Sequence, residues 1–246
     1  MPHRFFNFLF FFWNIFLETI FPWQCCFCKK ETHHYPLCQN CKKNIPINSF
    51  FIYPNSKKNI YDLSKDYCLN NNLFYILGIT SSYKNPVLAK SLHLFKYQRI
   101  ISLKDPLSDL MIKFLKKTKF FSITRKKHFL IIPIPLHHKK QRKRGFNQSE
   151  LLAKNISSCF SLNYDSEILI RIKNNSPQAN IRNLNERKKN VKNIFKISSN
   201  KTNLIKNKWI ILVDDVYTSG STMQEAIRIL KKNKPRKIIG LVLAKG

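Results

Sequence analysis

Acidic residues are scarce in this sequence, and their scarcity sets its charge. The chain of 246 residues holds 13 aspartates and glutamates against 44 lysines and arginines, which gives a formal net charge of +31 at pH 7. This excess excludes a neutral surface and favours polyanionic partners such as nucleic acid, phosphorylated metabolites or an acidic membrane surface. Lys, Asn, Ile and Phe are abundant throughout, as an A/T-rich genome would produce, so part of the charge reflects composition alone.

The sequence also lacks an uninterrupted apolar run of the length that crosses a membrane. Residues 5–21 are rich in Phe but contain Asn7, Asn14 and Glu18, whereas a spanning helix needs about 20 predominantly apolar residues. The Phe-Pro-Trp-Gln-Cys that follows is not the small-residue cleavage site of a secretory signal. We expect a helix that docks its apolar face on the protein or on a partner, and membrane association is the less favoured alternative.

The seven cysteines do not look like a disulfide framework. Four of them form two close pairs, a pattern typical of metal ligation in a reducing compartment, so we expect a cytoplasmic protein. Two Cys-x-x-Cys pairs separated by nine residues can direct four thiolates at one tetrahedral ion, and four protein ligands leave no open position, as in structural Zn²⁺ sites. Cys26 leaves the register ambiguous, and His33 or His34 could replace a cysteine. The expected ligands are Cys25, Cys28, Cys38 and Cys41.

The segment from residue 210 to residue 233 carries the strongest functional signal. Ile210–Val213 is a run of four apolar residues, which predicts a strand buried on both faces, and residues 220–233 predict a helix. Asp214 and Asp215 close the strand, where their carboxylates can accept hydrogen bonds from the vicinal hydroxyls of a ribose. The loop that follows suits the sugar phosphate, because hydroxyls and backbone N–H groups gather at a helix N-terminus. Its candidate residues are Thr218, Ser219, Gly220, Ser221 and Thr222.

Two other interpretations of this segment stay open. One is an ordinary strand, turn and capped helix with two solvated aspartates. The other is the acidic pair of response-regulator receivers, although that pair is expected at the first strand of a domain, and here only about 30 residues remain.

A basic loop forms the second candidate site. Residues 128–135 predict a strand that ends at prolines, which cannot continue a β-ladder. The following residues, 137–144, are dense in Lys, Arg and His and lie directly between this strand and a predicted helix. Such a loop suits pyrophosphate or a nucleic-acid backbone, and a solvated run of charges is the alternative. The candidate contacts are Lys139, Arg142 and Arg144.

The remaining elements are predicted from their periodicity. Residues 50–72 read as a linker or irregular loops, and residues 73–83 as one or two short strands. A helix is expected after Pro86, with Leu88, Leu92 and Phe95 facing inward. A second helix is expected over residues 106–117. A third is expected after residue 148, with Leu152, Ile156 and Cys159 on one face. Lys96 is read as a surface residue of the first of these helices, or alternatively as pointing toward an anionic ligand.

Several motifs together resemble a known family. Residues 144–148 read Arg-Gly-Phe-Asn-Gln, and they are followed by Ser-Pro-Gln at 176–178, by Arg182 and Arg187, by residues 190–193 and by Phe195. With the Asp-Asp phosphate loop downstream, this order resembles the ComF/GntX family, proteins associated with competence and DNA utilisation. The similarity extends from about residue 22 to residue 244. The segment around Asp214 is itself similar to the phosphoribosyl-pyrophosphate (PRPP) signature of type I phosphoribosyltransferases.

This resemblance implies an α/β fold, with a type I phosphoribosyltransferase-like parallel sheet flanked by helices and a small N-terminal zinc module. We expect residues 1–48 to form the apolar segment and zinc-binding module, and residues 49–246 the phosphoribosyltransferase-like domain. The resemblance also implies that Asp214 and Asp215 bind ribose hydroxyls, that residues 218–222 bind the 5′-phosphate, and that residues 135–144 face the pyrophosphate with Mg²⁺. No residue stands out as a general base.

Two departures from the family pattern are visible. Some relatives carry a second cysteine pair before the catalytic domain, whereas here only Cys68 lies in that region. Tyr217 also stands where a smaller residue, often Thr, is usual. Three functions stay open: a PRPP-binding transferase, a nucleic-acid-binding protein without turnover whose partner is single-stranded DNA, and a protein that senses PRPP or a related phosphorylated ribose.

Overall fold

A computed structural model describes residues 22–32, 35–54, 58–61, 63, 74–122, 128–173 and 192–246. The predictions for residues 5–21, for His33 and His34, and for the motif residues between 176 and 191 lie outside these described residues. Among the described residues, no helix is both long and apolar enough to cross a membrane.

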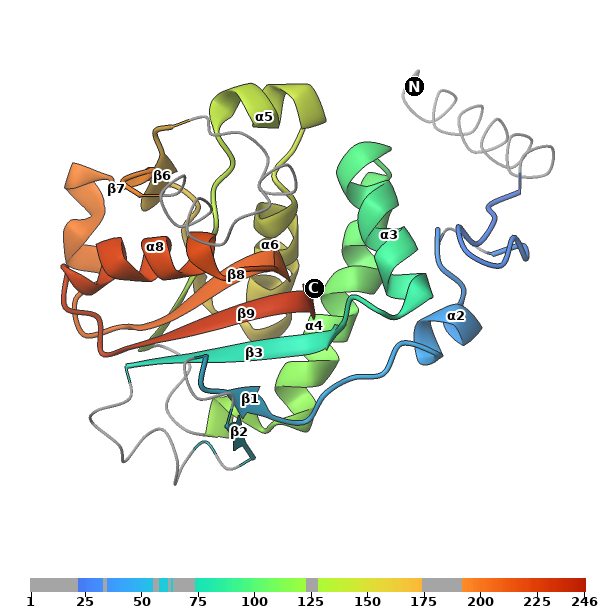
Figure 1. The fold of residues 1–246 in the computed structure, drawn as a ribbon, viewed down its shortest axis with the longest axis horizontal. Coiled ribbons are helices and arrows are strands. Elements are labelled where there is room, and N and C mark those ends of the chain that lie inside the picture. Colours follow the sequence, from blue (N-terminus) through green and yellow to red (C-terminus); the bar gives the residue numbers. More distant parts are fainter. Residues whose placement is uncertain are drawn as a thin grey trace, which may run out of the picture.

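A mainly parallel sheet forms the centre of the fold (Figure 1). Within the described residues it has seven strands in the order β2-β1-β3-β9-β8-β4-β5. The last five of these run parallel, whereas β1 pairs antiparallel with both β2 and β3. The strands are β1 (Phe51–Ile52), β2 (Asn59–Ile60), β3 (Tyr75–Ser82), β4 (Phe129–Pro133), β5 (Asn163–Tyr164), β8 (Trp209–Tyr217) and β9 (Lys237–Lys245).

Helices cover both faces of this sheet. One apolar core joins the sheet to α3, α4 and α6, and a second joins the opposite face to α8 and to a small antiparallel sheet of β6 and β7. The expected α/β fold with a mostly parallel sheet between helices is therefore confirmed. The elements are α3 (Pro86–Tyr97), α4 (Lys104–Lys117), α6 (Gln148–Phe160), α8 (Ser221–Lys231), β6 (Leu169–Arg171) and β7 (Phe195–Ile197).

The central strands are apolar runs because helices bury both of their faces. All five residues of β4 are buried, and so are the first five of β8 and the first eight of β9. Strands of this kind cannot show the apolar-polar alternation of a half-exposed strand. The two helices predicted after Pro86 and near Pro106 also bury their apolar faces. In α3, Leu88, Leu92 and Phe95 are fully buried, as predicted, and α4 includes Pro106.

Four local predictions differ from the structure. Residues 50–72 are not wholly irregular, because β1 and β2 add two short strands to the edge of the sheet. The basic loop forms a short helix, α5 (His138–Arg144). Strand β8 continues beyond the acidic pair to Tyr217. On α6, Cys159 is exposed, and Phe160 completes the buried face with Leu152 and Ile156.

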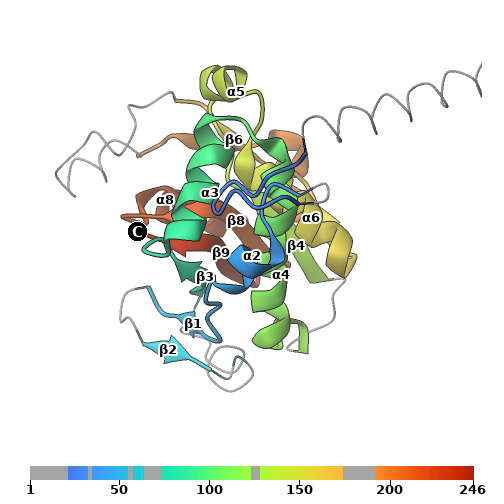
Figure 2. The same cartoon turned by 90° about the vertical axis from the view of Figure 1, so that its right-hand side faces the viewer.

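The cysteine-rich segment packs directly on the helices of the sheet domain, as Figure 2 shows for α2 (Gln39–Lys43) beside α3 and α4. Cys25 and Cys41 belong to the same buried core as Leu88 and Leu92 of α3. The side-chain amide of Asn85, which caps α3, also donates to the carbonyl of Asn44 at 3.0 Å. The segment therefore shares its core with the domain.

Candidate functional site

The acidic pair lies near the carboxyl end of β8, where α6 contacts Asp214 and α3 contacts Asp215. Asp214 is half-buried and Asp215 is buried. The hydroxyl of Ser149, in the first turn of α6, donates to Asp214 Oδ1 at 2.8 Å, and the backbone N–H of Asp215 donates to the same oxygen at 2.9 Å. Burial, followed by the repulsion from Asp215, raises the pKa of Asp214 to about 7. This carboxyl therefore titrates close to neutrality.

Lys96 reaches the acidic pair from α3, the helix that stands across the carboxyl ends of the central strands (Figures 1 and 2). Its Nζ lies 2.9 Å from Asp215 Oδ1, and the two side chains are 18% and 11% exposed. Burial lowers the pKa of Lys96, but the charges of Asp215 and Asp214 outweigh that effect and raise it overall. Lys96 is thus not a surface residue, and its contact is with a carboxylate.

The loop that is predicted to bind a phosphate joins β8 to α8 through a left-handed glycine. Gly220 has φ +75° and precedes the first turn of α8, whose backbone N–H groups supply the partial positive charge that an anion requires. A Cβ on Gly220 would stand 2.1 Å from the hydroxyl of Tyr217, so only glycine fits beneath this ring. The hydroxyls of Ser219 and Ser221 lie 2.8 Å apart. Tyr217 therefore supports the loop and partly fills the space beside it.

The basic residues divide between two faces of α5. His137 caps the helix by accepting from the Lys139 backbone N–H, and Gly145, at φ +86°, ends it. Helical spacing leaves Lys139 and Arg142 exposed and turns Lys140 and Arg144 partly inward. Of the three predicted contacts, Arg144 thus lies nearest to the interior.

Contacts within the Arg-Gly-Phe-Asn-Gln motif brace this helix on the sheet. Arg144 Nη1 donates to Gln148 Oε1 at 2.8 Å, and Asn147 Nδ2 donates to the carbonyl of Ile134 at 3.1 Å. The ring of Phe146 packs on Phe95 of α3, with centroids 5.3 Å apart. The motif therefore holds α5 beside the helix that carries Lys96.

Arg171 is a further cation that the sequence did not suggest. It ends β6, and burial lowers its pKa, an effect that the nearby charge of Asp214 opposes. Burial likewise lowers the pKa of Lys140, and the charges of Arg171 and Arg144 lower it further. The cations of α5 and β6 thus act on one another's pKa values. No local pattern around residue 171 would have revealed this, because the proximity comes from the tertiary fold.

Among the residues that the structure describes, none beside the acidic pair can be assigned as a general base. Glu150, in the first turn of α6, forms an ion pair with Lys154 at 2.9 Å, which is a common arrangement one helical turn apart. The groups around the acidic pair can hold a charged phosphorylated ligand. The carboxylates can accept hydrogen bonds from hydroxyl groups, the N-terminus of α8 can bind one phosphate, and the nearby cations can bind further anionic groups.

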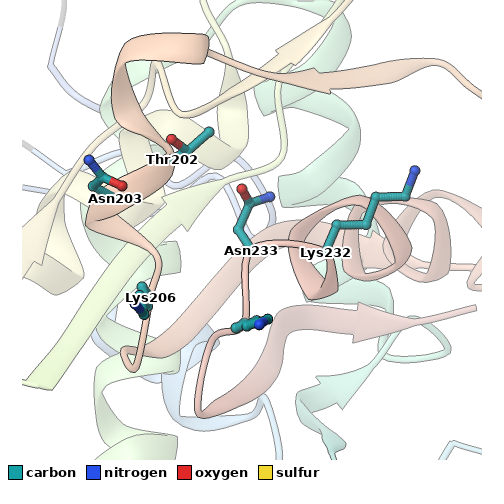
Figure 3. Close-up of a pocket in the computed structure, with 6 residues that line it drawn as sticks. Thr202, Asn203, Lys206, Lys232 and Asn233 are labelled. Atoms are coloured by element: carbon teal, nitrogen blue, oxygen red, sulfur yellow. The ribbon is translucent and has the colours of Figure 1, made fainter.

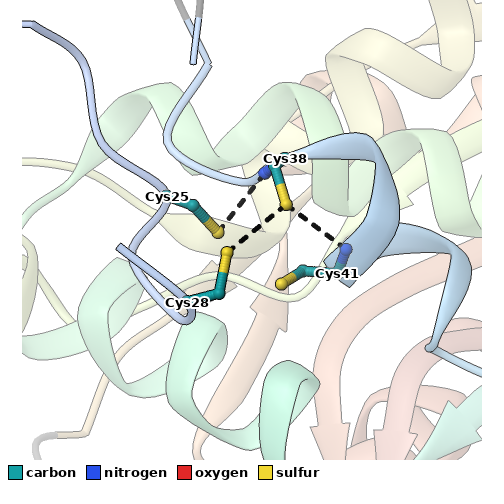
Figure 4. A group of neighbouring side chains, drawn as sticks. All are labelled: Cys25, Cys28, Cys38 and Cys41. Carbon is teal, nitrogen blue, oxygen red and sulfur yellow. Dashed lines mark hydrogen bonds between the residues drawn. The ribbon is translucent and has the colours of Figure 1, made fainter. Parts of the chain in front are cut away.

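The four predicted cysteine ligands converge on one point (Figure 4). Their sulfur atoms all lie within 4.8 Å of one another, and the Sγ atoms of Cys28 and Cys38 are 3.7 Å apart. Tetrahedral coordination with Zn–S bonds of about 2.3 Å requires sulfur atoms about 3.8 Å apart, so the cluster has suitable dimensions for such an ion. The register ambiguity is resolved, because Cys26 instead lies 3.9 Å from Ser91 Oγ of α3.

Backbone groups already favour a thiolate in this cluster. Burial tends to raise the pKa of Cys25, but hydrogen bonds from the backbone, including the Cys38 N–H at 3.4 Å, lower it to about 6. Burial and the neighbouring thiols raise the pKa of Cys41. A cation would stabilise all four thiolates together, and the cluster could therefore bind a metal ion.

A cavity of about 240 Å³ lies at the opposite, amino-terminal edge of the sheet (Figure 3). It precedes the first residues of β8 and β9, so about five residues of strand, or about 16 Å, separate it from the acidic pair. Figure 3 shows Lys232 pointing away from the other labelled side chains. The residues that line the cavity are Thr202, Asn203, Lys206, Lys232, Asn233 and Lys234.

Known proteins resemble the chain in the same regions. Residues 151–246, which include the acidic pair and the phosphate loop, match the family described as phosphoribosyl transferase domain. The chain is 27% identical over 221 residues to Competence protein F of Haemophilus influenzae, an alignment that covers 88% of this chain and 94% of that protein.

Two further relatives match over shorter stretches. DNA utilization protein YhgH of Shigella flexneri is 29% identical over 151 residues, which is 60% of this chain and 63% of the relative. Competence protein ComFC of Bacillus subtilis is 32% identical over 130 residues, which is 52% of this chain and 49% of the relative. These matches confirm the predicted resemblance to ComF-type proteins with a phosphoribosyl transferase domain.

Proposed function

We propose, from the similarity of the chain to ComF-type proteins and from its match to the phosphoribosyl transferase domain, that it binds PRPP or a related phosphorylated ribose at the carboxyl end of β8. The observation that carries the proposal is the juxtaposition of Asp214 and Asp215 with the Gly220 loop at the N-terminus of α8. Hydroxyl acceptors and a phosphate cradle on adjoining residues suit the two ends of a ribose 5-phosphate.

The assignment of the remaining groups follows from charge. Residues Thr218 to Thr222 would hold the 5′-phosphate, and the two carboxylates would accept from the ribose hydroxyls. The inward-facing cations Lys140, Arg144 and Arg171 would face the pyrophosphate, whose departure from the ribose leaves charge that cations stabilise. Lys139 and Arg142, although exposed, lie on the same helix and would add to the attraction of the polyanion.

Two metal ions belong to this proposal. Mg²⁺, when bound with the ligand, would neutralise phosphate oxygens, and the carboxylates of Asp214 and Asp215 are the kind of ligands that it prefers. Zn²⁺ would occupy the four-cysteine cluster in a structural role, because all four coordination positions come from the protein. The protein itself would orient Asp214 through the hydrogen bonds from Ser149 and from the Asp215 backbone, and it would keep the four cysteine sulfurs together.

The names of the relatives extend the proposal to a cellular role in DNA uptake or utilisation. The paired cysteines favour the cytoplasm as its compartment. Transfer of the phosphoribosyl group to an acceptor is the favoured activity, with residues 49–246 acting as the transferase-like domain and residues 1–48 as the zinc-binding module. The second candidate is a protein that binds single-stranded DNA, or senses PRPP, on the same fold without turnover. The net charge of +31 favours this second candidate.

Isothermal titration with PRPP, with and without Mg²⁺, tests the proposal. Binding that requires Mg²⁺ and is lost in Asp215→Asn supports it, whereas no heat of binding in either condition contradicts it. A repeat with single-stranded DNA as competitor separates the candidates: DNA that displaces PRPP shares the site, and DNA that binds alone with a steep salt dependence supports the second candidate.

A further inference from the structure

Lys96 occupies an unusual position for a lysine in a strongly basic protein. Its ammonium group lies 2.9 Å from Asp215, and its side chain is only 18% exposed, so the protein has removed most of its hydration. The charges of Asp215 and Asp214 raise the pKa of Lys96, and the charge of Arg144 lowers it. Lys96 therefore lies between the carboxylates that would receive a ribose and the cations that would receive a pyrophosphate.

The surrounding packing fixes this position. The preceding residue on α3, Phe95, is fully buried against Phe146 of the basic motif, and the following residue, Tyr97, lies under the guanidinium of Arg144 at 5.5 Å. Lys96 and Arg144 thus approach one region from two different elements. Two cations can lie close together only where a negative charge offsets their repulsion. In the ligand-free protein, Asp215 provides a negative charge of this kind.

The ion pair also sets a condition on the ligand. Asp215 cannot offer both of its oxygens freely to ribose hydroxyls while one of them is bound by an ammonium group. A ligand that supplies its own anion beside the ribose would remove this conflict, because Lys96 could turn from the carboxylate to that anion. A plain ribose 5-phosphate lacks such a group, whereas PRPP carries a pyrophosphate at C1.

We propose that Lys96 is a ligand-binding residue of this site that exchanges Asp215 for a pyrophosphate oxygen when PRPP binds, which makes the site selective for a 1-pyrophosphorylated ribose over ribose 5-phosphate. The inference rests on the proposed function and deepens it. The alternative is a purely structural ion pair, in which Lys96 stabilises α3 against β8 and never contacts the ligand.

Titration of three probes distinguishes these roles: PRPP, inorganic pyrophosphate and ribose 5-phosphate, each with Mg²⁺. In Lys96→Met, the affinity for PRPP and for pyrophosphate is expected to fall at least about tenfold, because a charge-assisted contact is lost. The affinity for ribose 5-phosphate is expected to stay the same or to rise, because Asp215 is released. Lys96→Arg should recover part of the pyrophosphate affinity.

Lys90→Met is the matched control, because Lys90 lies on the same helix, is exposed and makes its contact with the ring of Phe27 instead. It removes the same charge and should change the affinity for each probe less than about threefold. If Lys96→Met weakens all three probes equally, or leaves all three unchanged, the inference is wrong while the proposed function stands. If the wild-type protein binds none of the probes, both are wrong.

A second measurement needs no variant. The ammonium signal of Lys96, followed by ¹⁵N NMR in the wild-type protein, is expected to shift during titration with pyrophosphate and to stay in place during titration with ribose 5-phosphate. An ammonium signal that does not respond to saturating pyrophosphate would contradict the exchange even if Lys96→Met fails to fold.

Discussion

The four-cysteine cluster and the pair Asp214 and Asp215 both bring groups that can carry negative charge close together, but they differ in how that charge is compensated. The four cysteines bring their sulfur atoms within 4.8 Å of one another, and burial together with the neighbouring thiols raises the pKa of Cys41. The two aspartates come with a counter-ion of their own, since Lys96 lies 2.9 Å from Asp215. Lys96 thus already offsets part of the charge of the acidic pair, whereas the cysteine cluster could take its positive charge from a metal ion.

Removal of the metal ion should have the largest effect. Chelation, or Cys38→Ser, is expected to lower the melting temperature by about 10 °C, because metal binding contributes directly to folding and the cluster shares its core with α3 and α4. Calorimetry with and without chelator, together with metal analysis of the purified protein, measures this. Cys159→Ser, at an exposed cysteine outside the cluster, should change nothing. An unchanged melting temperature in the chelated protein would remove the contrast between the clusters.

The loop beside the acidic pair should show the next largest effect. Gly220→Ala combines a left-handed backbone with a clash against Tyr217, so we expect a loss of about 2–4 kcal/mol in the free energy of unfolding. Gly145→Ala is the matched control: its φ is +86°, but no atom lies within 4 Å of the added Cβ, so the loss should be only about 1 kcal/mol. Urea denaturation compares them. Equal losses would show that Tyr217 does not constrain the loop.

The two aspartates should respond to neutralisation with opposite signs. The pKa of Asp214 is raised to about 7, so the native state holds a proton that the unfolded state releases, and its contribution to stability falls as the pH rises from about 4 to about 7. Asp214→Asn should therefore stabilise the ligand-free protein at pH 8 by about 1–3 kcal/mol, and not at all below pH 4. Asp215→Asn should destabilise it by about 1–3 kcal/mol, because Lys96 loses its partner.

Thermal unfolding between pH 4 and pH 8 measures both variants. The same series of PRPP titrations should show that each variant binds the ligand more weakly, although one is more stable. Two variants that shift stability in the same direction would contradict the view that Lys96 compensates mainly Asp215.

The lysine-lined cavity at the amino-terminal edge should be the least sensitive region. Lys232 and Lys234 follow α8, where basic residues favour the helix dipole, and the cavity lies away from the acidic pair. Lys232→Ala with Lys234→Ala should change stability by less than about 1 kcal/mol and PRPP affinity less than about twofold. A larger loss of PRPP affinity would show that overall charge, rather than the arrangement around Asp215, controls binding.

Sequence predicted the parts of this molecule that are local. The strand, loop and helix around Asp214 were predictable because an apolar run, an acidic pair and a hydroxyl-rich loop follow one another directly. The four-cysteine cluster was predictable from spacing alone, and the structure places Cys25, rather than Cys26, in it. Helix α5 could also have been recognised, since a basic last turn followed by Gly145 is a common helix ending.

The counter-ions of the site could not be predicted in the same way. Lys96 and Arg171 lie on elements far from Asp214 in sequence, and only the packing of α3 and β6 around the sheet brings them near it. Strands β1 and β2 were missed because each has only two residues, too few for any periodicity to be visible. The cations near Asp214 and Asp215 are thus placed by the tertiary fold, and no local sequence pattern reveals them.

Helix α3 contributes to the surroundings of both clusters, since Leu88 and Leu92 share a buried core with Cys25 and Cys41, and Lys96, about one turn after Leu92, lies beside Asp215. If the four cysteines hold a metal ion, protein purified without that ion is expected to lose order in the segment that packs on α3. An apparent lack of sugar-phosphate affinity in such a preparation would report on the missing metal, and zinc content has to be known before a negative binding result is given weight.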